Sequence, residues 1–263
     1  MKTNRRYVVR LFGPLLGVML LAACATPPAG GNGFDEINDP LEPMNRVIFS
    51  FNQFVDGLIF KPLALMYRDI LPPEIQDGIG GILETLRTPI VLANDLLQGD
   101  VDRAGETLSR FAINATVGLG GIIDVATDMG LEGHNEDFGQ TLAVWGSGEG
   151  MYLVLPLLGP SNPRDAIGMG VDTFLDPLHY YANTKQLLAR TLARGVDERA
   201  GVIDSLDDIE RTSIDYYATM RSLYRQHRDD LIRNGSPAPL IPIPSISFDD
   251  FESPQEEQAA LVE

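Results

Sequence analysis

The single cysteine of this 263-residue chain has the surroundings that most clearly predict a chemical reaction. Cys24 directly follows Leu21, Ala22 and Ala23. Small residues before a cleavage point let a peptidase bind the extended backbone, and a cysteine at the new N-terminus offers a thiol that can accept diacylglycerol. The spacing therefore predicts cleavage before Cys24 and attachment of lipid to its sulfur.

The segment before Cys24 has the composition of a secretory signal. Its first part carries four basic residues, Lys2, Arg5, Arg6 and Arg10. The apolar stretch from Leu11 to Ala23 is too short to span a bilayer. We therefore predict a signal peptide at residues 1–23. The pattern looks like a bacterial lipobox, and Ala25 in place of Asp indicates export to the outer membrane, where several acyl chains give stable anchoring. The alternative is an ordinary signal peptide that ends beside a cysteine.

The other reactive side chains match no catalytic or metal-binding motif. Residues 145–150 have the wrong spacing for the Gly-x-Ser-x-Gly turn of serine hydrolases. His134 lies near Glu136 and Asp137, but in a glycine-rich loop we expect such residues to be solvated. The histidines lack His-x-x-x-His spacing: His134, His179 and His227. We predict no catalytic residues, no metal site and no cofactor beyond the covalent lipid.

Charge and cysteine count exclude further classes. Cleavage removes four of the 20 basic residues and none of the 37 acidic ones, which leaves 240 residues with a formal charge of −21. Such a chain is unsuited to binding nucleic acid or to docking on anionic headgroups by charge alone. With Cys24 acylated, no thiol remains for a disulfide or a metal. No mature segment offers eighteen uncharged apolar residues, so the sequence predicts no transmembrane helix.

Composition divides the mature chain into three parts. Residues 24–38 are rich in Gly, Pro and Ala and indicate a lipidated flexible tether. Residues 39–234 show the helical period and predict one all-α domain of amphipathic helices. Residues 235–263 are proline-rich and acidic, which favours a disordered tail, although residues 241–248 could form a docking strand.

The first predicted helix has a long apolar face. Asp39 and Pro40 have the residue types of a helix start. Large apolar residues follow at helical spacing: Met44, Val47, Ile48, Phe51, Phe54, Val55, Leu58 and Ile59. Such a face either packs in the core of a helical domain or lies in the acyl region of one leaflet.

Further helices are predicted along the domain. They are expected at 75–86, from Thr88-Pro89 to Gln98, from Asp100 to 115, at 122–128, from Arg164, and over 184–234 with breaks near Gly195 and near Ser205 or Thr212. Residues 151–158 are expected to be a short strand or a buried extended segment.

Ordered motifs carry a resemblance to a known family. The string from Asn38 to Arg46 (NDPLEPMNR), followed by Phe49-x-Phe51-Asn52, resembles the start of the MlaA (VacJ) family of outer-membrane lipoproteins. More of the pattern follows in order: Lys61-Pro62, Tyr67, Pro89, Asn94, Leu97-Gln98-Gly99, Arg110-Phe111, Asn114, Gly118, Gly120-Gly121-x-x-Asp124, Phe138-Gly139-x-Thr141-Leu142, Gly146, Tyr152, Pro156, Gly159, Arg164-Asp165, Arg199-Ala200 and Arg228. The match covers roughly residues 38–234.

The resemblance implies a fold and a function. Members of this family are helical rings in the inner leaflet of the outer membrane. An amphipathic pore through the ring lets mislocalised phospholipid leave the outer leaflet and pass to a periplasmic carrier of the MlaC type, which preserves lipid asymmetry. The resemblance also implies association with a trimeric porin. Two alternatives remain open, namely a structural lipoprotein that only binds porin and stabilises the envelope, and an enzyme that hydrolyses phospholipid.

Two groups of residues are candidates within this picture. The first is a loop expected near the pore, although turn formation would equally account for it: Gly118, Gly120, Gly121 and Asp124. The second is the membrane-facing side of the first helix: Phe49, Phe51, Phe54 and Leu58.

Overall fold

A computed structural model describes residues 38–234 and 236. The predicted signal peptide, Cys24, the tether before residue 38 and nearly all of the predicted tail lie outside the described residues. The helices are α2 (Glu42–Val55), the π-helical turn η1 (Asp56–Phe60), α3 (Lys61–Ile70), α4 (Pro73–Gln98), α5 (Val101–Thr116), α6 (Val125–Asp128), α7 (Phe138–Val144), α8 (Pro163–Leu175), α9 (Leu178–Tyr181), α10 (Thr184–Gly201), α11 (Ile203–Thr212) and α12 (Tyr216–Ile232). The predicted all-α class is confirmed, since the described strands form one short antiparallel hairpin, β1 (Leu153–Leu155) and β2 (Gly159–Ser161).

Helix starts follow local capping chemistry. Asp100, Asp137 and Asn162 each accept a hydrogen bond from a backbone N–H of the first turn that follows. Asn183 forms a capping box with Gln186 at the start of α10. The start of the first helix differs from the prediction, because α2 begins at Glu42 rather than directly after Asp39. The Asp39 carboxylate instead accepts hydrogen bonds from Tyr217 and Arg221 of α12.

Two predicted helix boundaries are wrong. Helix α4 continues through Pro89, where a break was expected, and ends at Gly99 in the left-handed conformation. A proline removes one hydrogen bond from a helix, and the packing of α4 against α5, α7 and α10 holds the backbone in place across that gap. Helix α10 likewise continues through Gly195 and ends only at Val202, whereas the break after Thr212 lies where one was predicted.

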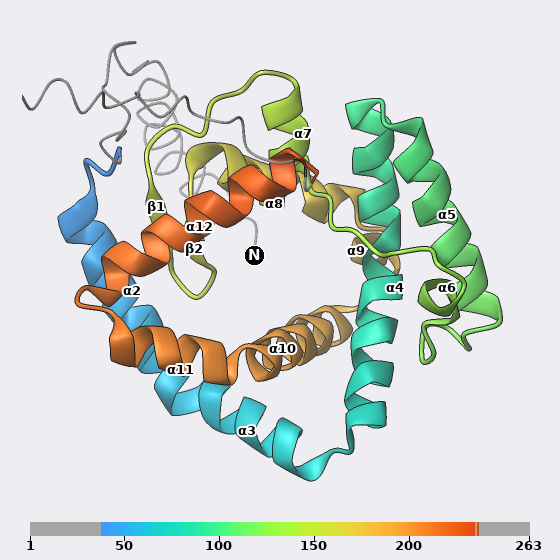
Figure 1. The fold of residues 1–263 in the computed structure, drawn as a ribbon, viewed down its shortest axis with the longest axis horizontal. Coiled ribbons are helices and arrows are strands. Elements are labelled where there is room, and N and C mark those ends of the chain that lie inside the picture. The colour runs from blue at the N-terminus through green and yellow to red at the C-terminus, as the bar shows by residue number, and fades with distance from the viewer. Residues whose placement is uncertain (1–37, 235, 237–263) are drawn as a thin grey trace, which may run out of the picture.

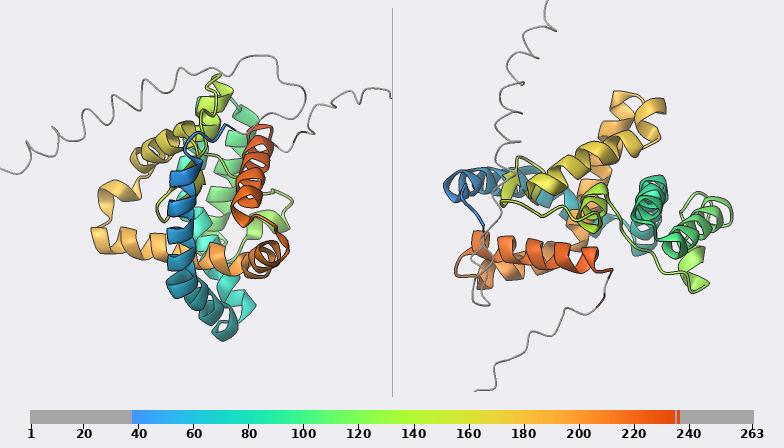
Figure 2. Two further views of the ribbon diagram at one scale, coloured as in Figure 1. Left: turned by 90° about the vertical axis from the view of Figure 1, so that its left-hand side faces the viewer. Right: turned by 90° about the horizontal axis from the view of Figure 1, so that it is seen from above.

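The helices follow one another around a central region that no described element crosses (Figure 1). Helices α2, η1 and α3 form one side, α4 with α5 packed outside it forms another, and α7 and α8 pack together opposite α10. Helix α10 also packs on α3 and α4, which closes the ring. Seen from above in Figure 2, α12 lies toward one face of the ring and α9 toward the other, so different elements border the two ends of the centre.

Burial in this ring is reversed relative to an ordinary globular domain. The largest side chains that are fully buried are all polar: Gln140, Glu136, Asn45, Asn94, Thr141, Asp95 and Ser161. Large apolar side chains are exposed on nearly every helix, among them Phe54, Leu58 and Ile70. Within the part of the chain that the structure describes, no helix is both long enough and apolar enough to cross a membrane.

Candidate functional site

The centre of the ring holds two adjoining cavities, of about 620 and 340 Å³. Their lining residues come mainly from α4, α8, α10 and α12, whose arrangement in the ring is seen in Figure 1. Both cavities are lined by Arg87, Asp137, Arg194 and Glu198, so they meet at these four charged side chains. We call the two cavities together the central hollow. Its wall carries both signs of charge, which suits a ligand with a polar, charged portion.

One side of the hollow is a buried ion-pair network on α8 and α12. Arg228 donates to Asp137 at 2.6 Å and to Asp165 at 2.9 Å. Tyr224 donates to Asp165 at 2.5 Å, and Arg164 donates to the same carboxylate at 3.0 Å. Burial alone would raise the pKa of Asp137, but the hydrogen bonds and charge of Arg228 lower it to about 2. This carboxylate is therefore held ionised against the wall.

The charges of two other wall residues, Asp172 and Arg87, are less well compensated by their neighbours. Burial raises the pKa of Asp172, although it accepts hydrogen bonds from the Asn94 amide at 3.0 Å and the Phe138 backbone at 3.1 Å. Burial and the neighbouring charge of Arg194 lower the pKa of the Arg87 guanidinium. Among the described residues, Arg87 donates only to the Asn135 side chain at 2.8 Å and weakly to a backbone carbonyl.

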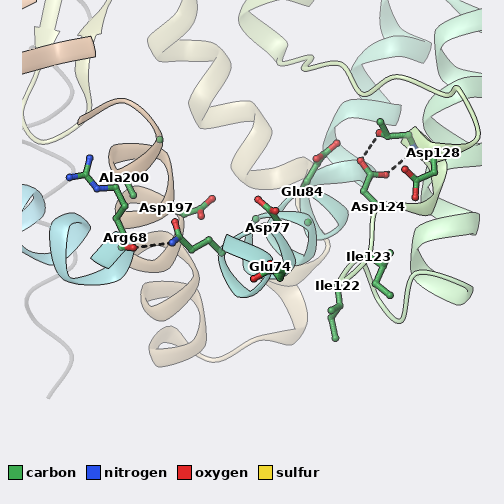
Figure 3. A pocket seen from close by; sticks show the side chains of 15 residues that line it. Arg68, Glu74, Asp77, Glu84, Ile122, Ile123, Asp124, Asp128, Asp197 and Ala200 are labelled. Atoms are coloured by element: carbon green, nitrogen blue, oxygen red, sulfur yellow. Dashed lines mark hydrogen bonds between the residues drawn. The ribbon is translucent and has the colours of Figure 1, made fainter. Parts of the chain in front are cut away.

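A third cavity, of about 810 Å³, adjoins the central hollow through Gly80, Glu84 and Asp197. Figure 3 shows its acidic side chains around one space, with Asp77 and Glu84 from α4 and Asp197 from α10. Of the four loop candidates, Asp124 lines this cavity, while none of the three glycines is among the lining residues.

Asp124 also has a structural role at the start of α6. It accepts hydrogen bonds from Thr127, Asn114 and Arg110. Burial would raise its pKa, but these donors lower it to about 2. The carboxylate is thus ionised and bound into the loop, at the edge of a cavity that continues into the central hollow.

The three loop glycines have distinct local environments. A side chain at Gly121 would overlap Thr85 and lie 2.6 Å from the Gly81 carbonyl oxygen, so glycine permits the loop to approach α4 closely. A side chain at Gly118 would lie 2.7 Å from the Asn114 carbonyl oxygen. Gly120 has φ of +79° with open space around it, as a turn requires.

The four membrane-facing candidates separate into two groups. Phe51, Phe54 and Leu58 are exposed by 49%, 66% and 63%. The prediction for Phe49 is wrong, because this ring is buried and packs against Tyr216 and Tyr217 at centroid distances of 5.4 and 5.5 Å. Phe49 therefore attaches α2 to α12, while the other three face outward.

His134 has a different acidic partner from those that the sequence suggested. Its Nε2 lies 3.0 Å from Asp95 and 3.2 Å from the Thr107 hydroxyl, and the side chain is largely buried. The group joins the loop before α7 to α4 and α5. Within residues 38–234 and 236, no cluster of three His, Cys, Asp or Glu side chains could hold a metal ion.

Sequence reasoning missed the arginines of the hollow. They are Arg87 on α4, Arg190 and Arg194 on α10, and Arg228 on α12. A signal was present at Arg87, since a charged residue interrupts the apolar run of α4. Periodicity could not show that three separate helices turn these residues toward one space.

Comparison with known proteins places this ring in a family. The model of the MlaA lipoprotein family matches residues 37–231. The intermembrane phospholipid transport system lipoprotein MlaA of Escherichia coli (strain K12) is 34% identical over 233 residues, which are 86% of this chain and 90% of that protein. The protein of the same name from Haemophilus influenzae is 30% identical and covers 84% of this chain and 91% of its own.

Two further similarities agree with this. An uncharacterized protein of Rickettsia bellii is 35% identical over 75% of this chain and 78% of its own length. A solved structure from work on the structural basis for maintenance of bacterial outer membrane lipid asymmetry aligns with a TM-score of 0.67 and 34% identity, covering 74% of this chain and 98% of the solved one. The resemblance predicted from the motifs is thus confirmed, and the chain belongs to the MlaA lipoprotein family.

Proposed function

We propose that this protein removes mislocalised phospholipid from the outer leaflet of the outer membrane through the central hollow, without breaking a covalent bond. Relatives at 30–34% identity are named as lipoproteins of an intermembrane phospholipid transport system. The observation that carries the proposal is the distribution of side chains in the ring: large apolar side chains are exposed on its outside, while charged side chains, beside apolar ones such as Ile90 and Met169, line its centre. Such a ring can lie in one leaflet and still offer a polar route for a headgroup.

The proposal includes an anchor and partners. Lipid on Cys24 holds the ring at the periplasmic side of the outer membrane, with Phe51, Phe54 and Leu58 in the acyl region. The loop of Gly118, Gly120, Gly121 and Asp124 reaches the passage through Asp124, which lines the third cavity. A trimeric porin positions the ring, and a periplasmic carrier of the MlaC type receives the lipid, as the family resemblance implies.

Filling the hollow tests the proposal. Thr191 lies on α10 and lines the larger central cavity, and Thr191→Trp places a bulky ring in that space. In an Escherichia coli strain lacking its own MlaA, we expect the wild-type chain to lower outer-leaflet phospholipid, measured by its accessibility to added phospholipase. Thr191→Trp should fail to do so at equal protein level.

The matched control is Thr212→Trp at the exposed end of α11, away from the residues that line the hollow. This variant should act as the wild type does. Full activity of Thr191→Trp would argue against passage through the hollow and in favour of a scaffold that only binds porin. Fatty acid released by the purified wild-type protein would argue for hydrolysis instead.

A further inference from the structure

Four arginines line the larger cavity of the central hollow, and they divide by how fully they are paired. Arg228 is bound to Asp137 and Asp165. Arg190 is bound to Asp176 and to the Leu86 carbonyl oxygen. These two guanidinium groups already bind carboxylates of the wall, so few of their N–H donors remain for a ligand.

Arg87 and Arg194 are less fully paired. Within the described residues, Arg87 makes no ion pair within 4.0 Å, and its hydrogen bonds go to Asn135 and to the Glu136 carbonyl oxygen. Arg194 uses its Nε to bind Glu198 at 2.6 Å, and no hydrogen bond from its two Nη atoms is found in the described part of the chain. Both side chains therefore keep N–H donors for another acceptor.

The two groups also lie near each other in a confined place. Both line each of the two central cavities, so they stand where these cavities meet. The charge of Arg194 acts on the buried Arg87 guanidinium and, together with burial, lowers its pKa. Two like charges in such a place are stabilised by an anion that accepts hydrogen bonds from both.

The geometry points to Arg87 and Arg194 as a phosphate-binding pair inside the passage, which takes the phosphodiester of a phospholipid headgroup. Planar guanidinium groups match phosphate oxygens through paired N–H donors. Carboxylates that already have partners, Asp137 and Glu198, flank the pair and limit how strongly an anion is held. A weakly held headgroup can move on, which a passage requires. This inference rests on the function proposed above and names the residues that recognise its cargo.

Binding to the full mature protein, purified in maltoside detergent, tests the inference. The probes are dihexanoyl phosphatidylethanolamine, inorganic phosphate and dihexanoylglycerol, which has the same chains without phosphate. We expect Arg87→Gln and Arg194→Gln each to weaken binding of the phospholipid by about tenfold, since one charge-assisted hydrogen bond is lost in each. Binding of dihexanoylglycerol should be unchanged in both variants.

Two control variants and the exposure of Arg194 separate recognition from folding. Arg87→Lys keeps the charge and should recover most of the affinity. Arg194→Gln changes a residue whose side chain is 37% exposed, so the fold tolerates its loss. Arg211→Gln removes an arginine from the exposed pair with Asp208 on α11 and should bind phospholipid as the wild type does.

The outcomes are distinct. Wild-type affinity for the phospholipid in the double variant Arg87→Gln/Arg194→Gln would overturn the inference and leave transport through the hollow standing. Inorganic phosphate bound as tightly as the phospholipid would overturn the assignment to a lipid headgroup. Failure of the wild-type protein to bind any of the three probes would count against the proposed function itself.

Discussion

The outer surface of α2, η1 and α3 and the wall of the central hollow carry opposite kinds of side chain. The outer surface exposes large apolar residues such as Phe54, Leu58 and Ile70. The wall presents arginines and carboxylates, with Arg228 and Asp165 nearly buried between helices. In a water-soluble domain the two environments would be exchanged. The difference is the one that the proposed function requires, namely an apolar medium around the ring and a polar route inside it.

The largest expected loss of folding stability follows from a substitution inside the ring. Asp165→Ala leaves Arg228 and Arg164 buried without this carboxylate, and removing one partner of a buried ion pair costs about 3–5 kcal/mol. Chemical unfolding in detergent measures the change. Asp208→Ala, which removes an exposed pair with Arg211, should stay within about 1 kcal/mol. Equal, small losses for both variants would contradict a polar interior that holds the ring together.

The outside of the ring is tested by placing a charge on it. Phe54→Asp should weaken attachment of the non-acylated mature chain to phospholipid vesicles by up to about 2.5–3.5 kcal/mol, because a carboxylate enters the acyl region. The fold should be little affected, since Phe54 is 66% exposed. Vesicle flotation measures attachment. Ser205→Asp on the exposed polar face of α11 is the control, and equal attachment of both variants would break the comparison.

Acid should lower the folding stability of the ring through protonation of Asp137. Its pKa is lowered from 3.8 to about 2 in the folded chain. A lowered folded pKa contributes stability above the unfolded value, and this stability is lost as pH falls from about 4 toward 2. The full contribution is about 2–3 kcal/mol. Urea unfolding between pH 2 and 6 should show less acid dependence for Asp137→Asn, while Asp208→Asn should retain the wild-type slope.

The prediction with the smallest expected effect concerns two positions on α2. Trp145 is the only tryptophan, so Trp145→Phe provides a background without this fluorophore. In that background Phe51→Trp should be quenched by brominated acyl chains, because position 51 is exposed. Phe49→Trp should not be quenched, because position 49 packs against α12. The same quenching at both positions would mean that α2 does not lie with one face in the leaflet.

The sequence predicts the helices better than it predicts what they enclose. Helical period and capping residues such as Asp100 suffice to locate α2 and α5, because these signals are local. Tertiary packing overrides local preference at Pro89 and Gly195, which lie inside continuous helices. Phe49 and Phe51 lie about 200° apart around a helix, so they could not share one face.

The hollow itself has no local signature. Arg87, Arg194 and Asp137 come from α4, α10 and the start of α7, and only ring closure brings them to one place. By contrast, the family motifs identified the fold and the candidate loop, because their order along the chain is visible without coordinates. Which charged residues meet inside the ring depends on how each helix is rotated about its own axis. Hydrophobic periodicity indicates only which face of a helix points outward.

The π-helical turn η1 has a consequence for the outer surface. Exposed apolar residues recur along α2, η1 and α3 at positions 47, 51, 54, 58, 63, 66 and 70. From Leu58 to Leu63 this line advances by five positions across the wide turn, which holds one residue more than an α-helical turn, and Ile59 within that turn is exposed as well. Because the wide turn absorbs this extra residue, the downstream line of side chains stays in phase with the upstream line. Deleting Gly57 would therefore leave an ordinary α-helical turn with α3 still in phase, whereas one further inserted residue would rotate α3 by about 100° relative to α2 and turn its apolar side out of the line.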